Sequence, residues 1–291
     1  MKNTFKKAEI ITLMVVVGIL AMACASLKIA NVEWDTLKGP NMARQYIGIN
    51  TSEVTVSVNY ENGERKEVKV KSLNYDKDKA GVQTVAVDLG DSSGSFQTEV
   101  MELTGIRLSP AKTLYYIDEK YTSVGLKIFG IWKNMPEQEL SFGQTLALFP
   151  SGFDSSTVAA ARNITYTWNG KTATFPITVI PALTSGQKSA ASAFTPAQNQ
   201  PSPVGTWTMT FRVFVDMYTS TATFNADGTV TFVTRGLSTS STNYTWFVTG
   251  GNMLILVNPV TGEGSTNLYS IADNKLTYLA TNGQLLEYTR R

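Results

Sequence analysis

Histidine is absent from this 291-residue chain, and cysteine occurs once, as Cys24. The lack of histidine removes the commonest general base, the commonest metal ligand and every nucleophile pair that depends on an imidazole. A single cysteine excludes an intramolecular disulfide and a zinc site built from cysteines. We therefore expect no catalytic residues, no metal and no cofactor, and we predict that the protein is not an enzyme.

Charge is also scarce, since Asp, Glu, Lys and Arg make up 16% of the residues while apolar residues make up 43%. Removal of Lys2, Lys6, Lys7 and Glu9 with an N-terminal leader would leave equal numbers of basic and acidic residues. A neutral body without a basic stripe argues against a nucleic-acid partner. The abundance of Thr, Val, Tyr and Phe favours β-strands.

A short basic leader, MKNTFKKAE, precedes an uncharged and mostly apolar stretch at residues 10–23. As a helix this stretch would rise about 21 Å, which is short of the roughly 30 Å of a bilayer's hydrocarbon core. The leader, the apolar stretch and the small residues Ala21 and Ala23 are typical of a secretory signal peptide over 1–23, cut between Ala23 and Cys24. Extension of the apolar stretch to Leu27 leaves an uncleaved anchor as an alternative.

The segment LAMAC at residues 20–24 resembles the lipobox of bacterial lipoproteins, in which a peptidase cuts before a diacylglycerylated cysteine. Ala21 stands where the lipobox has its usual leucine, and Leu20 lies one place before it; relaxed lipoboxes of this kind are common in spirochaetes and their relatives. The resemblance implies lipid attachment at Cys24, a tether over 24–35 and a location at the outer membrane or the cell surface. Cleavage by an ordinary signal peptidase is the alternative.

Residues 46–181 contain two related series of strand-like segments in which apolar and polar residues alternate. In the first series, the dipeptide Asn62-Gly63 between alternating runs is a strong hairpin signal. The charged run ERKEVKVK that follows it is expected to be the solvated face of an edge strand, and a patch for an anionic ligand is the alternative. The recurring pairs are Tyr46/Tyr116, Val54/Val124, Val56/Leu126, Val58/Ile128, Val85/Ile164, Val87/Tyr166, Phe96/Phe175 and Val100/Val179.

The stretches YIGINTSEVTVSVNYENGERKEV, AGVQTVAVD and PSGFDSSTVAAARNITYTWNGKTATFPITV resemble bacterial immunoglobulin-like domains of cell-surface proteins. The second copy lacks the YENGE and AG pieces of the first. The resemblance implies two immunoglobulin-like β-sandwiches in tandem, at 36–104 and 105–181.

Residues 182–203 are rich in Pro, Ser and Ala, and this composition predicts a linker. Beyond them, turn signals such as FNADGTV, TGGN and TNGQ separate eight strand-like runs. Eight short consecutive strands predict an up-and-down antiparallel barrel at 204–291. The runs lie at 206–214, 220–224, 229–235, 243–248, 253–257, 266–271, 275–280 and 285–290.

The opening Gly205-x-Trp207, the segments FNADGTVTF and NMLIL and the terminal YTRR resemble the compact lipocalin-like domains at the ends of many bacterial lipoproteins. The resemblance implies that Trp207 packs at the closed end of the barrel under Arg290, which is a structural role. Bulky residues at alternate positions predict a packed interior rather than a ligand cavity. These residues are Met209, Phe211, Phe224, Phe232, Trp246, Phe247, Leu254 and Leu256.

The sequence thus predicts an all-β, lipid-anchored envelope protein in which immunoglobulin-like modules form a stalk that presents the barrel for binding or adhesion. The expected partners are a membrane, through the N-terminal lipid, and a host or envelope protein or glycan. We expect a monomer. The alternatives are a membrane-tethered carrier of a small hydrophobic ligand and a purely architectural envelope protein.

Overall fold

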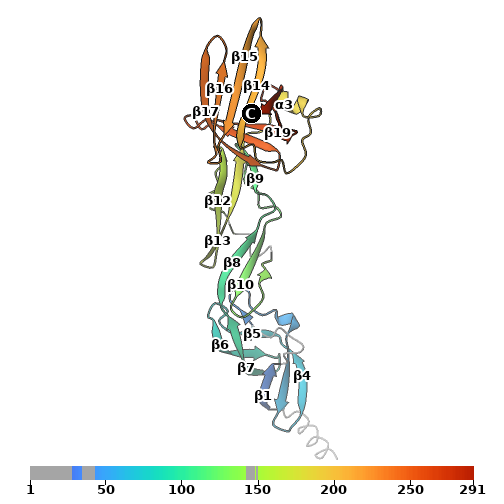
Figure 1. Cartoon of the computed structure of the whole chain (residues 1–291). Helices are drawn as coiled ribbons and strands as arrows, with labels where there is room; N and C mark the ends of the chain where they lie inside the picture. The colour runs from blue at the N-terminus through green and yellow to red at the C-terminus, as the bar shows by residue number, and fades with distance from the viewer. Residues whose placement is uncertain (1–27, 35–42, 142–147, 149) are drawn as a thin grey trace, which may run out of the picture. The chain divides into compact units, whose positions relative to one another are not determined.

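The structure is a computed structural model that describes residues 28–34, 43–141, 148 and 150–291 (Figure 1). The described regular structure is β-strand apart from α3 (Ser185–Ala190) and the 3-10 turn η1 (Thr51–Glu53). The prediction of an all-β protein is therefore confirmed. The predicted signal peptide, Ala23 and Cys24 lie outside the described residues.

The chain divides into two compact units, one made of Met1–Thr104 and Ile131–Glu137, the other of Gly105–Gly130 and Gln138–Arg291. In the first unit, two sheets share one core of valine and phenylalanine side chains. The first sheet contains, in spatial order, β1 (Ile29–Trp34), β3 (Thr55–Tyr60) and β4 (Arg65–Lys69). The second contains β2 (Ala43–Arg44), β7 (Ser93–Met101), β6 (Gly81–Asp88) and β5 (Ser72–Asn74).

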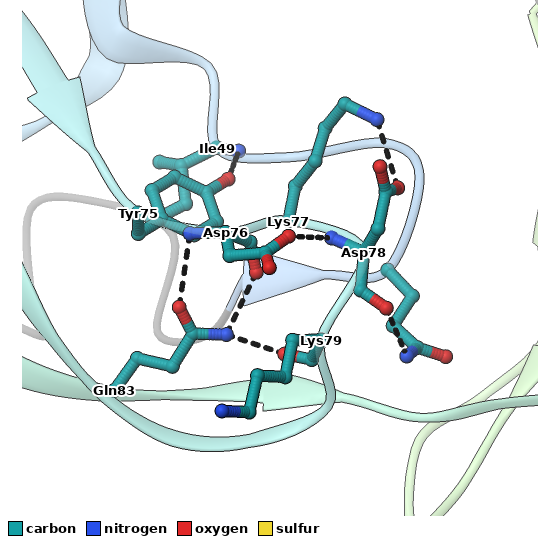
Figure 2. A network of polar contacts seen from close by, with 8 residues as sticks. Ile49, Tyr75, Asp76, Lys77, Asp78, Lys79 and Gln83 are labelled. Atoms are coloured by element: carbon teal, nitrogen blue, oxygen red, sulfur yellow. Dashed lines mark hydrogen bonds and ion pairs between the residues drawn. The ribbon is translucent and has the colours of Figure 1, made fainter.

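A network of polar contacts fixes the loop between β5 and β6 (Figure 2). The side-chain amide of Gln83 donates to the carbonyls of Asp76, at 2.7 Å, and Lys79, and its oxygen accepts from the backbone N–H of Asp76. The Tyr75 hydroxyl accepts from the backbone N–H of Ile49 at 2.7 Å, and burial raises the pKa of this tyrosine. Because these groups satisfy one another, the network accounts for the conformation of the loop.

The next two sheets contain β11 (Gln138–Glu139), β10 (Lys127–Trp132) and β8 (Leu103–Ser109), and β12 (Ala159–Trp168), β13 (Lys171–Ile180) and β9 (Leu114–Tyr116). The short strand β9 runs parallel to the long strand β13, as β2 runs parallel to β7. Val100 of β7 pairs with Ala43, and its predicted counterpart Val179 of β13 pairs with Tyr115. A short strand that pairs in parallel with a long strand therefore occurs at equivalent places in the two predicted repeats.

Burial agrees with most of the predicted repeat but not with its beginning. The members of five pairs are buried in both copies: Val58/Ile128, Val85/Ile164, Val87/Tyr166, Phe96/Phe175 and Val100/Val179. The pair Val54/Val124 is a wrong prediction, since Val54 is fully buried and Val124 is 80% exposed. Val124 lies in the turn before β10 rather than in a strand. The alternation of buried and exposed side chains that a sheet imposes therefore does not apply at this position.

The last eight strands form a closed barrel in sequence order, each antiparallel to the next, which confirms the predicted eight-stranded antiparallel barrel. The strands are β14 (Gly205–Val213), β15 (Asp216–Phe224), β16 (Thr229–Arg235), β17 (Thr239–Thr249), β18 (Met253–Val257), β19 (Gly264–Ala272), β20 (Lys275–Leu279) and β21 (Leu285–Arg290). The main differences from the predicted runs are the starts of β15 and β17, which lie earlier in the chain, and Phe214, which lies in a turn.

The barrel interior is filled by aromatic and aliphatic side chains, among which Trp207, Phe224, Tyr269 and Leu276 are almost completely buried. Of the bulky residues expected inside, Trp246 packs against this cluster. The prediction that Phe247 also lies inside is wrong. Neighbouring side chains of a strand point to opposite faces, so with Trp246 on the inner face, Phe247 lies on the outer face. It lines a shallow groove of 340 Å³ together with residues 158–160 at the start of β12.

The segment 182–203, predicted to be a linker from its composition, contains α3 and forms hydrogen bonds with the barrel. Thr184 caps α3 in a reciprocal capping box with Gln187. The Gln187 side chain is fully buried, and its amide donates to the carbonyls of Thr266 at 2.7 Å and Leu279 at 3.0 Å. The segment is thus attached through hydrogen bonds instead of an apolar core, which its composition does not reveal.

Burial raises the pKa of six tyrosines, and this predicts how stability depends on pH. They are Tyr75, Tyr115, Tyr121, Tyr166, Tyr269 and Tyr278. A tyrosine whose folded pKa lies above its unfolded value stabilises the fold below about pH 10, and this contribution is lost as the pH rises through the folded pKa.

Because the chain has no histidine, we expect the melting temperature to be constant from about pH 6 to pH 9 and to fall above about pH 10. The replacement Tyr278→Phe removes one of the shifted groups and should lessen the alkaline decline. Calorimetry across this pH range measures both effects. A decline centred near pH 6.5, or the same alkaline decline in the variant, would contradict the assignment.

Candidate functional site

The barrel is closed by a short ladder between its first and last strands. Only Trp207↔Arg290 and Thr208↔Thr289 are paired between β14 and β21. By contrast, β14 pairs with β15 along its whole length. Beyond Thr208, therefore, β14 separates from β21 and continues as a hairpin with β15.

The three residues predicted as the structural motif of the barrel, Gly205, Trp207 and Arg290, lie together at this closure. The guanidinium carbon of Arg290 is 5.2 Å from the centre of the Trp207 ring, and the guanidinium donates to the carbonyl of Val204 at 3.2 Å. Gly205 has a φ of 134°, and a Cβ there would lie 3.3 Å from Nη2 of Arg290. Glycine thus allows the strand to begin in this conformation and the guanidinium to approach.

The residues that precede β14 cover the same end of the barrel. The indole N–H of Trp207 donates to the carbonyl of Pro203 at 2.7 Å. The Tyr269 hydroxyl donates to the carbonyl of Pro201 at 3.1 Å, and the side-chain oxygen of Gln200 accepts from the backbone N–H of Ile271 at 2.8 Å. The chain that enters the barrel therefore satisfies these three polar groups.

A groove with a volume of 780 Å³ lies where β14 and β21 separate, and it extends over β15 to the end of β16. Along β14, Trp207 points into the core, so Thr208 and Thr210 lie on the opposite, outer face. The groove is therefore on the outside of the barrel. Apart from Thr208, whose hydroxyl is buried, its hydroxyl groups belong to Thr210, Thr219, Thr221 and Thr289.

The charged residues of the groove leave two guanidinium groups uncompensated. Glu287 forms an ion pair with Lys275 at 2.8 Å. Within the described part of the chain, no ion pair of Arg235 or Arg291 is found. The Thr208 hydroxyl is buried and has no hydrogen-bond partner among the described residues. The groove thus offers hydroxyl groups and cations to a polar ligand.

The carboxylates of Asp227 and Asp154, which lie outside the strands, accept local hydrogen bonds. The side chain of Asp227 accepts from the hydroxyl and the backbone N–H of Thr229, which holds the pKa of Asp227 below its usual value. Hydrogen bonds from the backbone N–H and hydroxyl of Ser156 lower the pKa of Asp154 in the same way. Asp273 has a φ of 48° in the turn between β19 and β20.

The described residues contain neither a metal-binding cluster nor a membrane-spanning helix. No group of three or more His, Cys, Asp or Glu residues in the described ranges could hold a metal ion. In the same part of the chain, every helix is too short or too polar to cross a membrane.

Sequence reasoning missed the groove, although its signal is present in the sequence. Threonine occupies alternate positions in TWTMT of β14 and in TSTAT of β15. Such alternation is expected of any solvated sheet face, so by itself it does not indicate a site. What makes the groove is the separation of β14 from β21, which depends on a register that the sequence does not specify.

No protein-family model matches this chain. No curated protein matches it either. The geometry of the barrel therefore carries the functional argument.

The contact of Arg290 with Trp207 predicts a loss of stability in the variant Arg290→Met. This change removes the cation–π interaction and the hydrogen bond to Val204, and we expect the free energy of unfolding to fall by about 1–2 kcal/mol. The matched variant Arg291→Met removes a neighbouring charge that has no such contacts and should change it by less than about 0.5 kcal/mol. Denaturant titration measures both, and equal effects would refute the special role of Arg290.

Proposed function

We propose that this chain is a lipid-anchored cell-envelope protein without enzymatic activity, whose C-terminal barrel is a binding and adhesion domain. In this proposal, residues 1–23 are the signal peptide and Cys24 carries the lipid that binds the membrane. The observation that carries the binding role is the outer groove with its threonine hydroxyls and uncompensated arginines.

The parallel pairing of a short strand with a long strand, which recurs in both predicted repeats, supports a stalk of two immunoglobulin-like domains. In each module a short strand, β2 or β9, runs parallel to the last long strand, and the modules otherwise consist of antiparallel sheets. Two antiparallel sheets over a common core are the architecture of immunoglobulin-like domains. The Gly205, Trp207 and Arg290 contacts support a lipocalin-like assignment of the barrel in the same sense.

The chemistry of the groove favours an anionic, hydroxyl-rich ligand, such as a glycan with sulfate or carboxylate groups. Guanidinium groups bind carboxylates and sulfates through paired hydrogen bonds. Threonine hydroxyls both donate and accept, which suits the hydroxyl groups of a sugar. Arg235 and Arg291 would bind the acidic groups, and the threonines between them would bind the ring hydroxyls.

A carrier of a small hydrophobic ligand is the alternative function, and it would need a cavity among the interior side chains. Trp207, Phe224, Tyr269 and Leu276 fill one part of the interior. Mass spectrometry of organic extracts from the purified full chain tests this alternative, since a carrier should retain a lipid in stoichiometric amount.

Binding of a sulfated glycan, with heparin as the probe, tests the groove. The double variant Arg235→Gln/Arg291→Gln should bind heparin about tenfold more weakly or worse, because both paired contacts are lost. The charge-matched control Lys69→Gln/Lys71→Gln changes the charged run of the first unit and should bind as the parent protein does. Calorimetric titration measures the affinities. Equal losses in both variants, or no binding by the parent protein, would contradict the groove assignment.

The anchor makes a separate prediction about the mature N-terminus in a bacterial host. The parent protein should incorporate a fatty-acid label and begin at a modified Cys24, and the variant Cys24→Ser should incorporate none. Mass spectrometry of the N-terminal peptide distinguishes the cases. A parent protein that begins at Met1, or whose Cys24 is unmodified, would exclude lipid anchoring.

A further inference from the structure

Two neighbouring hairpin ends of the barrel carry a cluster of exposed apolar side chains, here called the apolar tip. Phe214 is 93%, Val215 83% and Leu237 78% exposed, and Val213 and Met217 are exposed beside them. The first hairpin end joins β14 to β15, and the second joins β16 to β17. Because β15 pairs antiparallel with β16, both ends lie at the same side of the barrel, as Figure 1 shows.

The first hairpin end has a sequence that does not suit its turn. Phe214 and Val215 form a two-residue loop between the paired residues Val213 and Asp216. Phe214 has a φ of 53°, in the left-handed region that tight hairpin loops usually fill with Gly, Asn or Asp. A phenylalanine in this position weakens the turn and exposes an aromatic ring, so the position is better explained by a function than by the fold.

The apolar tip has a packed base. The Tyr218 ring stacks on Phe211 at 5.7 Å between ring centres. A side chain at Gly236 would collide with the Tyr218 ring, so the second hairpin packs directly against the first. The exposed side chains are therefore presented on a supported surface, which lowers the entropic cost of binding.

Cationic side chains lie directly behind the apolar tip. Arg212 is paired with Met217 across the first hairpin, and Arg235 is paired with Thr219, two residues further along β15 from the end. One carboxylate, that of Asp216, lies nearer the loop, where it is paired with Val213. Along the hairpins, apolar side chains at the end are thus followed by an excess of positive charge.

We propose that the apolar tip inserts into the interfacial region of a lipid bilayer that contains anionic lipids, while Arg212 and Arg235 bind lipid phosphates. This order matches the order of acyl chains and headgroups in a bilayer. The tip is built from two separate loop ends and projects outward, which suits a fluid surface better than the fixed pocket of a protein partner. Val260, which is 91% exposed in the loop between β18 and β19, is a single exposed residue by comparison.

Tryptophan reporters test the insertion at the tip itself. The full chain carries Cys24→Ser in every sample, so that no acyl group is attached, and the leader is common to all samples. Phe214→Trp places a reporter at the tip, and Val260→Trp places a matched reporter in the loop between β18 and β19. The probe is a vesicle of phosphatidylglycerol and brominated phosphatidylcholine in equal parts, because bromine quenches tryptophan emission within the bilayer.

We expect vesicles to quench the Phe214→Trp reporter and shift its emission to the blue, while the Val260→Trp reporter stays unchanged. Quenching should weaken when phosphatidylglycerol is omitted and when Arg212→Gln/Arg235→Gln is added. Equal behaviour of the two reporters would overturn the proposal. Insensitivity of the Phe214→Trp signal to both charge changes would overturn the phosphate contacts.

Removal of the tip without damage to the fold completes the test. Phe214→Gly/Val215→Ser supplies the glycine that the turn favours, so the melting temperature should stay the same or rise. Its co-sedimentation with the same vesicles should fall about tenfold or more relative to the protein without this change, because a buried phenylalanine and valine are lost. Unchanged co-sedimentation by a stable variant would contradict membrane insertion. It would instead favour insertion of the apolar tip into a pocket of a protein partner.

Discussion

The closure of the barrel by Trp207↔Arg290 and Thr208↔Thr289 is the constraint on which the other features depend. A longer ladder between β14 and β21 would hold the hairpin of β14 and β15 against the barrel wall. Because the ladder ends at Thr208, that hairpin is free to continue, and the space left beside it is the threonine-lined groove. The same continuation carries Phe214 and Val215 away from the core. One short ladder thus produces both surfaces for which we propose a binding role.

So short a ladder needs support from side chains, and three kinds of contact supply it. The buried Trp207 ring fills the closed end and lies under the Arg290 guanidinium. Gly205 permits both the backbone conformation and the close approach of the arginine. The entering chain satisfies the indole N–H through Pro203. Each contact contributes little free energy alone. Together they stabilise the one seam at which the barrel would otherwise open.

Sequence patterns predicted the barrel well because its turns have strong chemical signals. The bounds of β16, β18 and β21 agree with the predicted runs, which are flanked by turns such as ADG and TNG. The loop of Phe214 and Val215 was missed because it lacks Gly, Asn and Pro and looks like more strand. The buried Gln187 was missed because its value lies in two hydrogen bonds to carbonyls distant in sequence. In the candidate site, Trp207 and Arg290 were predictable from a family resemblance, whereas the groove depends on strand register.

Hydrogen exchange at the closure tests this account most directly. If the ladder between β14 and β21 holds the barrel shut, the indole N–H of Trp207 and the backbone N–H of Arg291, which donates to Thr206 at 2.9 Å, should exchange only when the whole barrel unfolds. Their protection should match that of the most protected amides of β18 and β19. Exchange of these two groups at the faster rate of the hairpin ends would mean that the barrel opens locally at this seam, and the account would be wrong.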